Sequence, residues 1–369
     1  MRVLKNIFKE KDPALAYIAM CSRKKSPGVF NKINGTVNGA KSCGYNSRSI
    51  IIEPGHAGKY LLFLYKITFA KEKYVFIRYI NRIGLFIFIA GMILRIRRRK
   101  LYIDIPTPIQ HHLREIFIHG KITWIKLLDA FLMVIQGSLP FLSATKIIQH
   151  GEESRWFSSG VRSKTIKIGN GVDVSSVPCR NSAPILMGHC LNLVAVGTVA
   201  SWHGWDRMIK AIKVIKDAAQ TGFDVKFKII GEGPDLERLK QLVLSYNLSD
   251  NVFFSGLLYG DDLYNEYKIA HYGVDSLGWD RVSAYEASSI KVREYLAAGM
   301  PVITATKDPD FSGDESFLMT VPSNEDINCI AALLKKIYFM PVPQPRECRL
   351  FAENKLDFKV KMRSILPQF

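Results

Sequence analysis

Two acidic residues eight positions apart bracket a stretch rich in hydroxyl and basic groups in the C-terminal half of the chain. In YEASSIKVREYLAAGMPVITA, Glu286 precedes an expected short helix and Glu294 lies within it. If Ser288 or Ser289 caps this helix, its first backbone amides can bind a phosphate or diphosphate, and Lys291 adds a mobile positive charge. Carboxylates accept hydrogen bonds from sugar hydroxyls. The stretch can therefore bind a ligand that carries both kinds of group.

An ordinary surface helix is the alternative interpretation of this stretch. Lys291 and Glu294 are three positions apart, the spacing of a solvated ion pair that stabilises a helix by only about 0.3 kcal/mol. Val292 and Leu296 would pack the helix on a sheet, and Gly299 would turn the chain into the next strand. These residues alone do not separate the two interpretations.

Two further glycine loops follow apolar runs in the same half. In GTVASWHGWDR, Gly197 allows close backbone approach, and His203 and Arg207 can meet a phosphate, although a capped helix start explains the loop equally well. In IIGEGPDLERL, Gly231 opens a turn too short for a dinucleotide fingerprint, so a tight strand-to-helix turn is the simpler interpretation. Loops at the carboxyl ends of one parallel sheet meet at one crevice. Together the three loops would suit a nucleotide-diphosphate sugar.

The C-terminal half alternates strands with helices. NLVAVGTVA and VKFKIIG have the pattern of strands, and DRMIKAIKVIKDAAQ places its apolar residues on one helical face. Such alternation predicts crossover units and a parallel sheet. The Ser- and Pro-rich VSSVPCRNSAPILMGH resembles an interdomain linker. We therefore expect an α/β chain with Rossmann-like domains at 1–186 and 187–345, and a segment at 346–369 that crosses back to the first domain.

Length and charge narrow the class of protein. The chain has 369 residues, enough for two domains, and 48% hydrophobic residues exclude an intrinsically disordered protein. The net charge of +18 and the pI near 9.6 imply an anionic partner, such as nucleic acid, a membrane surface or a phosphorylated substrate. The six cysteines have no CxxC or metal-ligand spacing, which indicates a reducing cytosol.

The most membrane-like segment is IGLFIFIAGMILRIRRRK, and we expect no secretory signal. Its uninterrupted apolar part, Ile83 to Leu94, has 12 residues, whereas a helix needs about 20 to span a bilayer. A buried helix is the expected structure. A helix lying in the membrane plane beside a cationic flank is the alternative.

In this order and spacing, the motifs resemble the retaining glycosyltransferases of the GT-B architecture, in particular the family 4, or group 1, enzymes that build bacterial surface polysaccharides. KIGNGVDV, KIIGEGPDLERL and NVFFSGLL look like successive family motifs, and KVREYLAAGMPVI matches K-x-x-E-Y-x-A-x-G-x-P-V-I. The N-terminal half matches more loosely, through SPGVFNKINGTVNGAKSCGY and through YIDIPTPI, in which Asp104 replaces a family Glu. The resemblance implies two Rossmann-like domains that face each other across a cleft, the first for the acceptor and the second for the nucleotide sugar.

The resemblance also implies roles for single residues. Glu294 would bind the nucleotide ribose, while Glu286, at the donor sugar, and Lys291, at the diphosphate, would be the catalytic pair. The other residues expected to bind the donor are Ser288, Ser289, Gly197, His203, Arg207, Gly231 and Gly28.

This chain departs from the family pattern at two positions that normally contact the diphosphate. The usual G-R-x-x-x-E-K-G becomes GTVASWHG, so Thr198 replaces an Arg and His203 replaces a Lys. Arg207, Arg281 and Lys291 are the expected substitutes. Between the acids, EASSIKVRE replaces the commoner EGFGLVLLE, which makes the alignment of the first acid less secure than that of the second.

The reaction that we expect transfers a glycosyl group, with retention, to a glycan or polyprenyl-diphosphate-linked acceptor in exopolysaccharide, capsule or lipopolysaccharide synthesis. Basic side chains and helix amides would stabilise the departing diphosphate, so we expect neither a metal nor an organic cofactor. The acceptor's proton can pass to the departing phosphate oxygen, and His111 or His112 can contact the acceptor. The block Arg95–Lys100 would hold the enzyme at the anionic cytoplasmic face of the inner membrane.

Two other functions stay open at this point. A basic protein with interspersed aromatic residues can be a non-enzymatic binder of nucleic acid or of an anionic surface, but no nucleic-acid-binding signature is present, and we expect no nucleic-acid partner. The chain can also be a degenerate transferase that binds a nucleotide sugar without turnover, because Thr198 and His203 replace the phosphate-binding pair.

Overall fold

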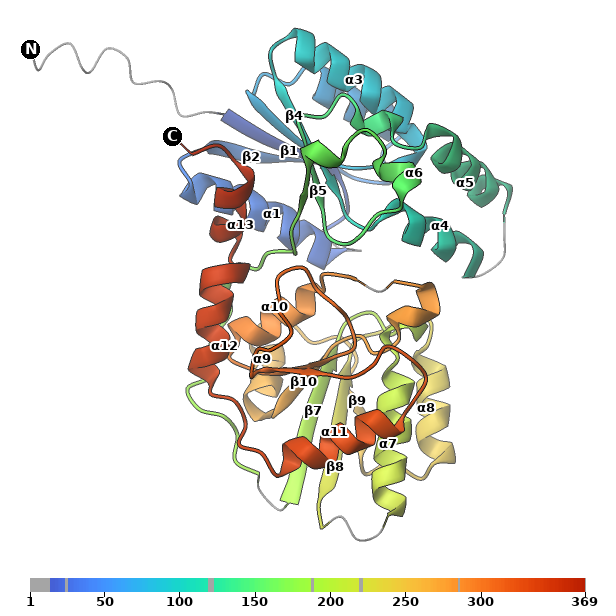
Figure 1. Cartoon of the computed structure of the whole chain (residues 1–369), viewed down its shortest axis with the longest axis vertical. Helices are drawn as coiled ribbons and strands as arrows, with labels where there is room; N and C mark the ends of the chain where they lie inside the picture. Colours follow the sequence, from blue (N-terminus) through green and yellow to red (C-terminus); the bar gives the residue numbers. More distant parts are fainter. Residues whose placement is uncertain are drawn as a thin grey trace, which may run out of the picture. The chain divides into compact units, whose positions relative to one another are not determined.

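The computed structural model describes residues 14–23, 26–118, 123–186, 189–218, 222–284 and 286–368. The chain forms two compact units (Figure 1). The N-terminal unit comprises Met1–Gly171 and Asp357–Phe369, and the C-terminal unit comprises Val172–Leu356. Each unit contains a six-stranded parallel sheet with helices on its faces. The predicted α/β class with two Rossmann-like units is confirmed.

The sheet of the N-terminal unit has the order β2-β1-β3-β4-β5-β6. Its strands alternate between two buried faces, because Leu15 and Tyr17 join one apolar cluster and Ala16 and Ile18 join another. The strands are β1 (Ala14–Met20), β2 (Asn46–Ile52), β3 (Tyr74–Arg78), β4 (Lys100–Ile105), β5 (Lys146–Gln149) and β6 (Thr165–Lys167). The helices are α1 (Pro27–Ser42), α2 (Lys59–Thr68), α3 (Gly84–Ile96), α4 (Ile109–Ile118), α5 (Trp124–Gln136), α6 (Arg155–Ser158) and α13 (Phe358–Ile365).

The last helix of the chain packs against the first helix of the same unit (Figure 1). A Cβ atom at Gly39 of α1 would lie 2.6 Å from the carbonyl oxygen of Phe358, and one at Gly35 would overlap the Phe358 ring. Only glycine therefore allows α13 to approach α1 so closely. The contact explains why Asp357–Phe369 belongs to the N-terminal unit.

The sheet of the C-terminal unit has the order β12-β11-β10-β7-β8-β9. Its strands are β7 (Cys190–Val196), β8 (Asp224–Ile230), β9 (Val252–Phe254), β10 (Tyr272–Val274), β11 (Val302–Thr304) and β12 (Leu318–Thr320). Its helices are α7 (Trp205–Asp217), α8 (Leu236–Ser245), α9 (Gly260–Ile269), α10 (Ile290–Ala297), α11 (Asn328–Tyr338) and α12 (Pro345–Phe351).

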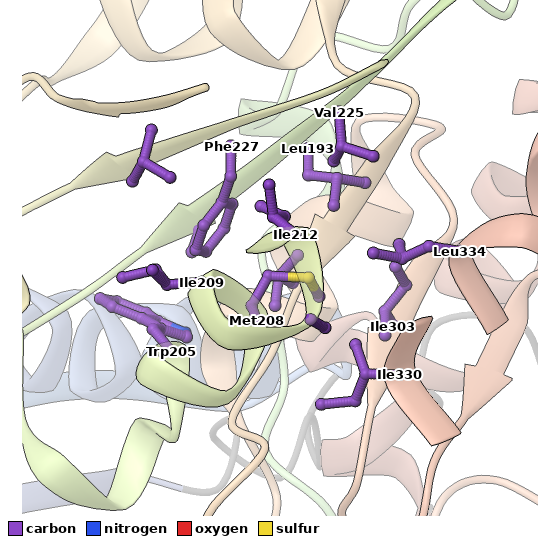
Figure 2. Close-up of a cluster of buried hydrophobic side chains, with 14 of the residues drawn as sticks. Leu193, Trp205, Met208, Ile209, Ile212, Val225, Phe227, Ile303, Ile330 and Leu334 are labelled. Carbon is purple, nitrogen blue, oxygen red and sulfur yellow. The ribbon is translucent and has the colours of Figure 1, made fainter. Parts of the chain in front are cut away.

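The apolar face predicted for α7 forms the centre of this unit's core. Met208, Ile209 and Ile212 lie against Phe227 of β8, and residues of β7, β11 and α11 complete the cluster (Figure 2). These side chains are almost fully buried. Burial of each stabilises the fold by about 1.5–3 kcal/mol, so the helix has one well-determined orientation on the sheet.

The division between the units falls at 171/172 rather than at 186/187. Val172 and Val174 lie in the same buried cluster as Val292 of α10. Arg180 donates to the carbonyl oxygens of Gly299 and Ala270 at 2.9 and 2.6 Å. The Ser- and Pro-rich stretch is therefore packed on the C-terminal unit, although its composition resembles that of a linker.

The membrane-like segment forms α3, which buries one side and exposes the other. Ile87, Ala90 and Leu94 are buried against the sheet, whereas Ile89 and Ile96 are exposed. No helix within the described part of the chain is long and apolar enough to cross a membrane. The prediction of a buried helix is therefore correct for only one of its sides.

Candidate active site

The loops predicted to form one crevice do lie together at the carboxyl ends of β7 and β8. The amide of Gly197 donates to the carbonyl oxygen of Ile230 at 3.0 Å. A Cβ atom at Gly231, where φ is +142°, would lie 1.9 Å from the carbonyl oxygen of Gly197. Both the conformation and the lack of space require glycine. Gly231 therefore allows the two strand-end loops to touch.

Lys291, near the start of α10, is the centre of the polar cluster in this region. Its Nζ lies 2.9 Å from Nδ1 of His203 and 3.3 Å from Oγ of Ser276, and 3.7 Å from Oδ1 of Asp275. The ammonium also lies 5.1 Å from the centre of the Trp205 indole, where a cation–π attraction is favourable. The structure thus brings together His203 and Lys291, which are far apart in sequence.

Burial determines the protonation of this cluster. It lowers the pKa of Lys291 to about 8, although the nearby Asp275 carboxylate opposes the shift. Burial and the Lys291 charge hold the pKa of His203 well below its ordinary value. Near neutral pH, Lys291 is therefore cationic and His203 is neutral. Nδ1 of the neutral ring accepts a hydrogen bond from the Lys291 ammonium, which assigns the His203 proton to Nε2.

The Lys291–Glu294 ion pair of the alternative interpretation does not form. Lys291 points to Asp275, and both side chains are largely buried. The Glu294 carboxylate makes no hydrogen bond or ion pair within the described ranges of the chain, and burial raises its pKa to about 7. A carboxylate with vacant acceptor sites can bind hydroxyl groups of a ligand. The alternative of an ordinary surface helix therefore fails at these two residues.

The start of α10 partly matches its prediction. Ser289 occupies the N-cap position, but its side chain makes no capping hydrogen bond. Ser288 and Glu286 lie in the preceding loop, where Glu286 pairs with Lys307 in a short parallel bridge. Only 7% of Glu286 is exposed. The loop thus positions this acid beside the end of β11, separately from Glu294 on the helix.

The prediction that Arg207 contacts a phosphate needs correction. Arg207 is fully buried, and its guanidinium donates to the carbonyl oxygens of Leu277, Pro322 and Asp326. These bonds join the start of α7 to two distant loops. Arg207 is therefore a structural residue, with its NH groups directed at backbone carbonyls instead of at a ligand.

Replacing Arg207 with methionine is expected to lower the free energy of unfolding by about 3 kcal/mol, because buried carbonyl groups would lose their donors. The thermal midpoint of the full chain measures this loss. Arg346→Met, at an exposed position of α12, is the matched control and should leave the midpoint unchanged. An unchanged midpoint in Arg207→Met with lost nucleotide binding would assign Arg207 to the ligand after all.

Arg281, a second expected substitute, is already paired. Its guanidinium binds Asp206 at 2.8 and 3.0 Å and Glu325 at 2.7 and 3.0 Å. These carboxylates neutralise its charge and connect the loop after β10 to α7 and to the segment before α11. Arg207, Arg281 and Lys291 were expected to replace the two altered diphosphate contacts. Of these three, only Lys291 contacts His203 at the strand ends.

Gly28 lies in the other unit, at the first turn of α1. The helix begins with proline after Ser26, whose side chain makes no capping hydrogen bond. Apart from its own helix backbone and its chain neighbours, no heavy atom of the described residues lies within 4 Å of the place where a Cβ atom at Gly28 would be. The start of α1 is therefore open at this point.

The N-terminal unit also has a polar cavity at the ends of β3 and β4. Its volume is about 390 Å³. Its lining combines apolar residues such as Ile80 and Met133 with polar side chains, namely Tyr60, Arg78, Asn81, Arg82, Thr107, His112 and Asp129. His111, the other histidine considered from the sequence, is buried and does not line this cavity. The structure therefore distinguishes the two neighbouring histidines.

A buried charged cluster in the same unit was missed by the sequence reasoning. Lys32 Nζ lies 3.1 Å from the Asp104 carboxylate and 2.8 Å from Nε2 of His150. Burial lowers the pKa of Lys32 to about 8 and also lowers the pKa of His150. Tyr17 donates to Asp104. These residues come from separate elements, so no spacing in the sequence could have connected them.

The sequence reasoning also missed an Asp-x-Asp pair, Asp308 and Asp310. Both carboxylates bind the guanidinium of Arg293, which is fully buried on α10. The network attaches the helix that carries Lys291 and Glu294 to the loop after β11. Among the described residues, no group of His, Cys, Asp and Glu side chains could hold a metal ion.

Residues 191–311 match the family model described as glycosyl transferases group 1, while no curated protein sequence matches the chain. The fold is similar to that of a sucrose-phosphate synthase from Thermosynechococcus elongatus, with a TM-score of 0.63, 13% identity and coverage of 96% of this chain and 97% of that chain. It is also similar to the lipopolysaccharide outer core galactosyltransferase WaaB (TM-score 0.61, 12% identity, 95% and 98% covered). A third similar structure is AviGT4, a glycosyltransferase involved in avilamycin A biosynthesis (TM-score 0.61, 11% identity, 96% of each chain covered).

The family match lies within the C-terminal unit and includes β7, the glycine loops and α10. The structural likeness extends over nearly the whole of both units. The predicted resemblance to family 4, or group 1, glycosyltransferases is confirmed. The chain thus has the GT-B architecture of these structures, and the match of residues 191–311 to the glycosyl transferases group 1 model supports glycosyltransferase activity.

Proposed function

We propose that this glycosyltransferase moves a sugar, with retention of configuration, from a nucleotide-diphosphate sugar to a hydroxyl group of a glycan acceptor. The observation that carries the proposal is the buried ammonium of Lys291, which His203 contacts at 2.9 Å at the strand ends of the C-terminal unit. Glu294 lies three residues further along the same helix, with an available carboxylate. This pairing supports a ligand with a diphosphate next to a ribose.

In the proposed reaction, the bond between the anomeric carbon and the diphosphate oxygen breaks as the acceptor oxygen bonds to that carbon on the same face. The acceptor's proton passes to the departing oxygen, so the step needs no protein base. Lys291 and the first amides of α10 stabilise the charge that develops on the diphosphate. Because Lys291 is largely buried, its charge is weakly screened and acts strongly.

The other roles follow from the placement of each side chain. Glu294 accepts hydrogen bonds from the ribose hydroxyls, and Glu286 accepts them from the donor sugar. His203, a neutral residue, orients Lys291 and adds no charge. The proposal assigns the stabilisation of the leaving group to Lys291 and the helix amides, and it requires no metal or organic cofactor.

The N-terminal unit supplies the acceptor site in this proposal. Arg78 and His112 line the cavity at the ends of β3 and β4, where Arg82 is paired with Asp129. Arg78 and His112 suit an acceptor with phosphate and sugar groups. We propose a polyprenyl-diphosphate-linked glycan at the cytoplasmic face of the inner membrane, in exopolysaccharide, capsule or lipopolysaccharide synthesis. The similar structure of a lipopolysaccharide outer core galactosyltransferase is compatible with this assignment.

A thermal-shift screen of the full chain against UDP-, GDP-, TDP- and CMP-sugars tests the donor class. At least one nucleotide-diphosphate sugar should raise the midpoint, because a ligand at about 100 times its Kd adds about 2.7 kcal/mol of stability. A CMP-sugar is the matched control, since it carries a single phosphate. No stabilisation by any nucleotide-diphosphate sugar would contradict the proposal.

A degenerate transferase is the second candidate, because neutral His203 stands where the family has a lysine. It predicts stabilisation by a donor without release of nucleoside diphosphate when acceptor is added. Salt-dependent binding to arbitrary RNA, without stabilisation by any donor, would instead indicate a non-enzymatic binder. The same screen, followed by a nucleotide-release assay, distinguishes these three functions.

A further inference from the structure

Three helices on one face of the N-terminal sheet expose rows of apolar side chains. On α3, Leu85, Ile89, Met92 and Ile96 follow helical spacing and are all exposed, with 79% exposure for Ile96. The opposite side of the helix packs on the sheet. A helix with both sides apolar is unusual at a protein surface that faces only water.

Helix α5 repeats this pattern beside α3. Trp124, Leu128, Phe131 and Ile135 form an exposed row, and Trp124 is 87% exposed. Ala130 and Met133 on the other side of α5 belong to the same buried cluster as Ile87 of α3. Figure 1 shows both helices on the N-terminal unit.

Helix α2 completes the layer. Leu61, Tyr65 and Phe69 are exposed in a row, and the rings of Tyr65 and Phe69 are 5.0 Å apart. Arg97, after the end of α3, donates to the carbonyl oxygen of Thr68, so the ends of these two helices are adjacent. We call the exposed rows of apolar side chains on α2, α3 and α5 the apolar face.

The charges on these helices are almost all positive. The only acidic residue in α2, α3 and α5 is Asp129, and the guanidinium of Arg82 binds its two oxygens at 2.7 and 2.5 Å. Arg95, Arg97 and Arg98 are exposed where α3 ends and make no ion pair with any residue in the described ranges. The apolar face therefore borders a cationic cluster with no acidic counterpart.

We infer that the apolar face is a membrane-docking surface that inserts into the interface of an anionic bilayer. Such a bilayer places negative headgroups directly above hydrocarbon, which matches exposed apolar rows next to arginines. A second copy of this chain fits less well, because it would bring two clusters of arginine together. The inference depends on this face alone, and not on the proposed transfer reaction.

Flotation of the full chain with lipid vesicles tests the inference. The chain should bind vesicles of equal parts phosphatidylcholine and phosphatidylglycerol, and bind phosphatidylcholine vesicles far more weakly. Trp124→Ser with Phe131→Ser should weaken binding about tenfold or more, because two exposed aromatic rings lose their apolar contact. The matched control is Leu244→Ser with Phe339→Ser, which removes exposed apolar side chains from the C-terminal unit and should leave binding unchanged.

The charge contribution has its own pair of variants. Arg95→Gln with Arg98→Gln should weaken binding about tenfold, whereas Lys335→Gln with Lys336→Gln, on exposed positions of α11, removes equal charge and should change it little. The fluorescence emission of Trp124 should move to shorter wavelength when anionic vesicles are added, because the indole leaves water. Trp124→Phe should still bind these vesicles but should lack this shift.

Three results would overturn the inference. One is the absence of binding to anionic vesicles, and another is equal loss in the control and test variants. The third is a stable dimer that Trp124→Ser with Phe131→Ser converts to a monomer without changing vesicle binding, which would assign the apolar face to a second copy. A failed donor screen leaves these results unaffected, so the two proposals are tested separately.

Discussion

Lys291→Met is expected to lower the rate of glycosyl transfer by about two to three orders of magnitude, the usual loss when one preorganised donor is removed from a developing anion. Lys291 is the cation that His203, Ser276 and Asp275 surround at the strand ends. Methionine has a similar length without the charge. Initial rates of nucleoside diphosphate release, at saturating acceptor, measure the effect.

The loss should fall mainly on kcat rather than on the KM of the donor, because the diphosphate gains charge only as its bond to the sugar breaks. Lys291→Arg keeps a cation and should recover part of the rate. Lys240→Met, on an exposed position of α8, is the matched control and should have parental kinetics. A folded Lys291→Met enzyme with unchanged kcat would remove Lys291 from the mechanism.

The pKa of Lys291 also gives this prediction a pH signature. Its pKa of about 8 lies below the ordinary value of 10.5, so the free enzyme loses the cation as pH rises through about 8. The donor kcat/KM should therefore fall above that pH. The profile of Lys291→Arg should stay flat there, because an arginine remains charged. A profile without a fall in the parent enzyme would contradict the assigned role.

The alternating pattern of the sequence was sufficient to predict the parallel sheets and the buried side of α7. It could not identify the contacts that divide the chain into units. Val174 and Arg180 lie in a stretch with the composition of a linker, yet Val174 belongs to the same buried cluster as Val292, and Arg180 donates to the carbonyl oxygen of Gly299. Such long-range packing leaves no periodic signal in the Ser- and Pro-rich stretch itself.

The candidate site shows the same limit. The sequence around an arginine in the first turn of a helix is the same whether its guanidinium binds a ligand or a backbone carbonyl. Arg207 is structural because it donates to the carbonyl oxygens of Leu277 and Pro322, which lie in distant loops. Asp275 and Ser276 were missed, although polar residues directly after an apolar strand are a usable signal. Lys291 was predicted because one short motif contains both it and Glu294.

Glu294→Ala should lower the affinity for the donor nucleotide about a hundredfold or more, because ribose hydroxyls would lose a charged acceptor, and hydrogen bonds to charged groups contribute about 1.5–3 kcal/mol each. Titration calorimetry with the nucleoside diphosphate measures the loss. Glu294→Gln keeps one acceptor oxygen and should bind with intermediate affinity. Glu237→Ala, on an exposed position of α8, is the control and should bind as the parent does.

The raised pKa of Glu294 separates loss of binding from loss of folding. Its value is about 7 in the fold against an ordinary 4.5, so the folded state favours the protonated acid, and ionisation destabilises the fold as pH rises through 4.5 to 7. At pH 8, ligand-free Glu294→Gln should therefore have a higher thermal midpoint than the parent, and this gain should vanish near pH 4.

The affinity of the parent protein for the nucleotide should rise with pH through about 7, because the ionised carboxylate is the better acceptor. Glu294→Gln should lack this rise. A variant that is more stable at pH 8 yet binds the nucleotide as tightly as the parent would show that the ribose contact lies elsewhere.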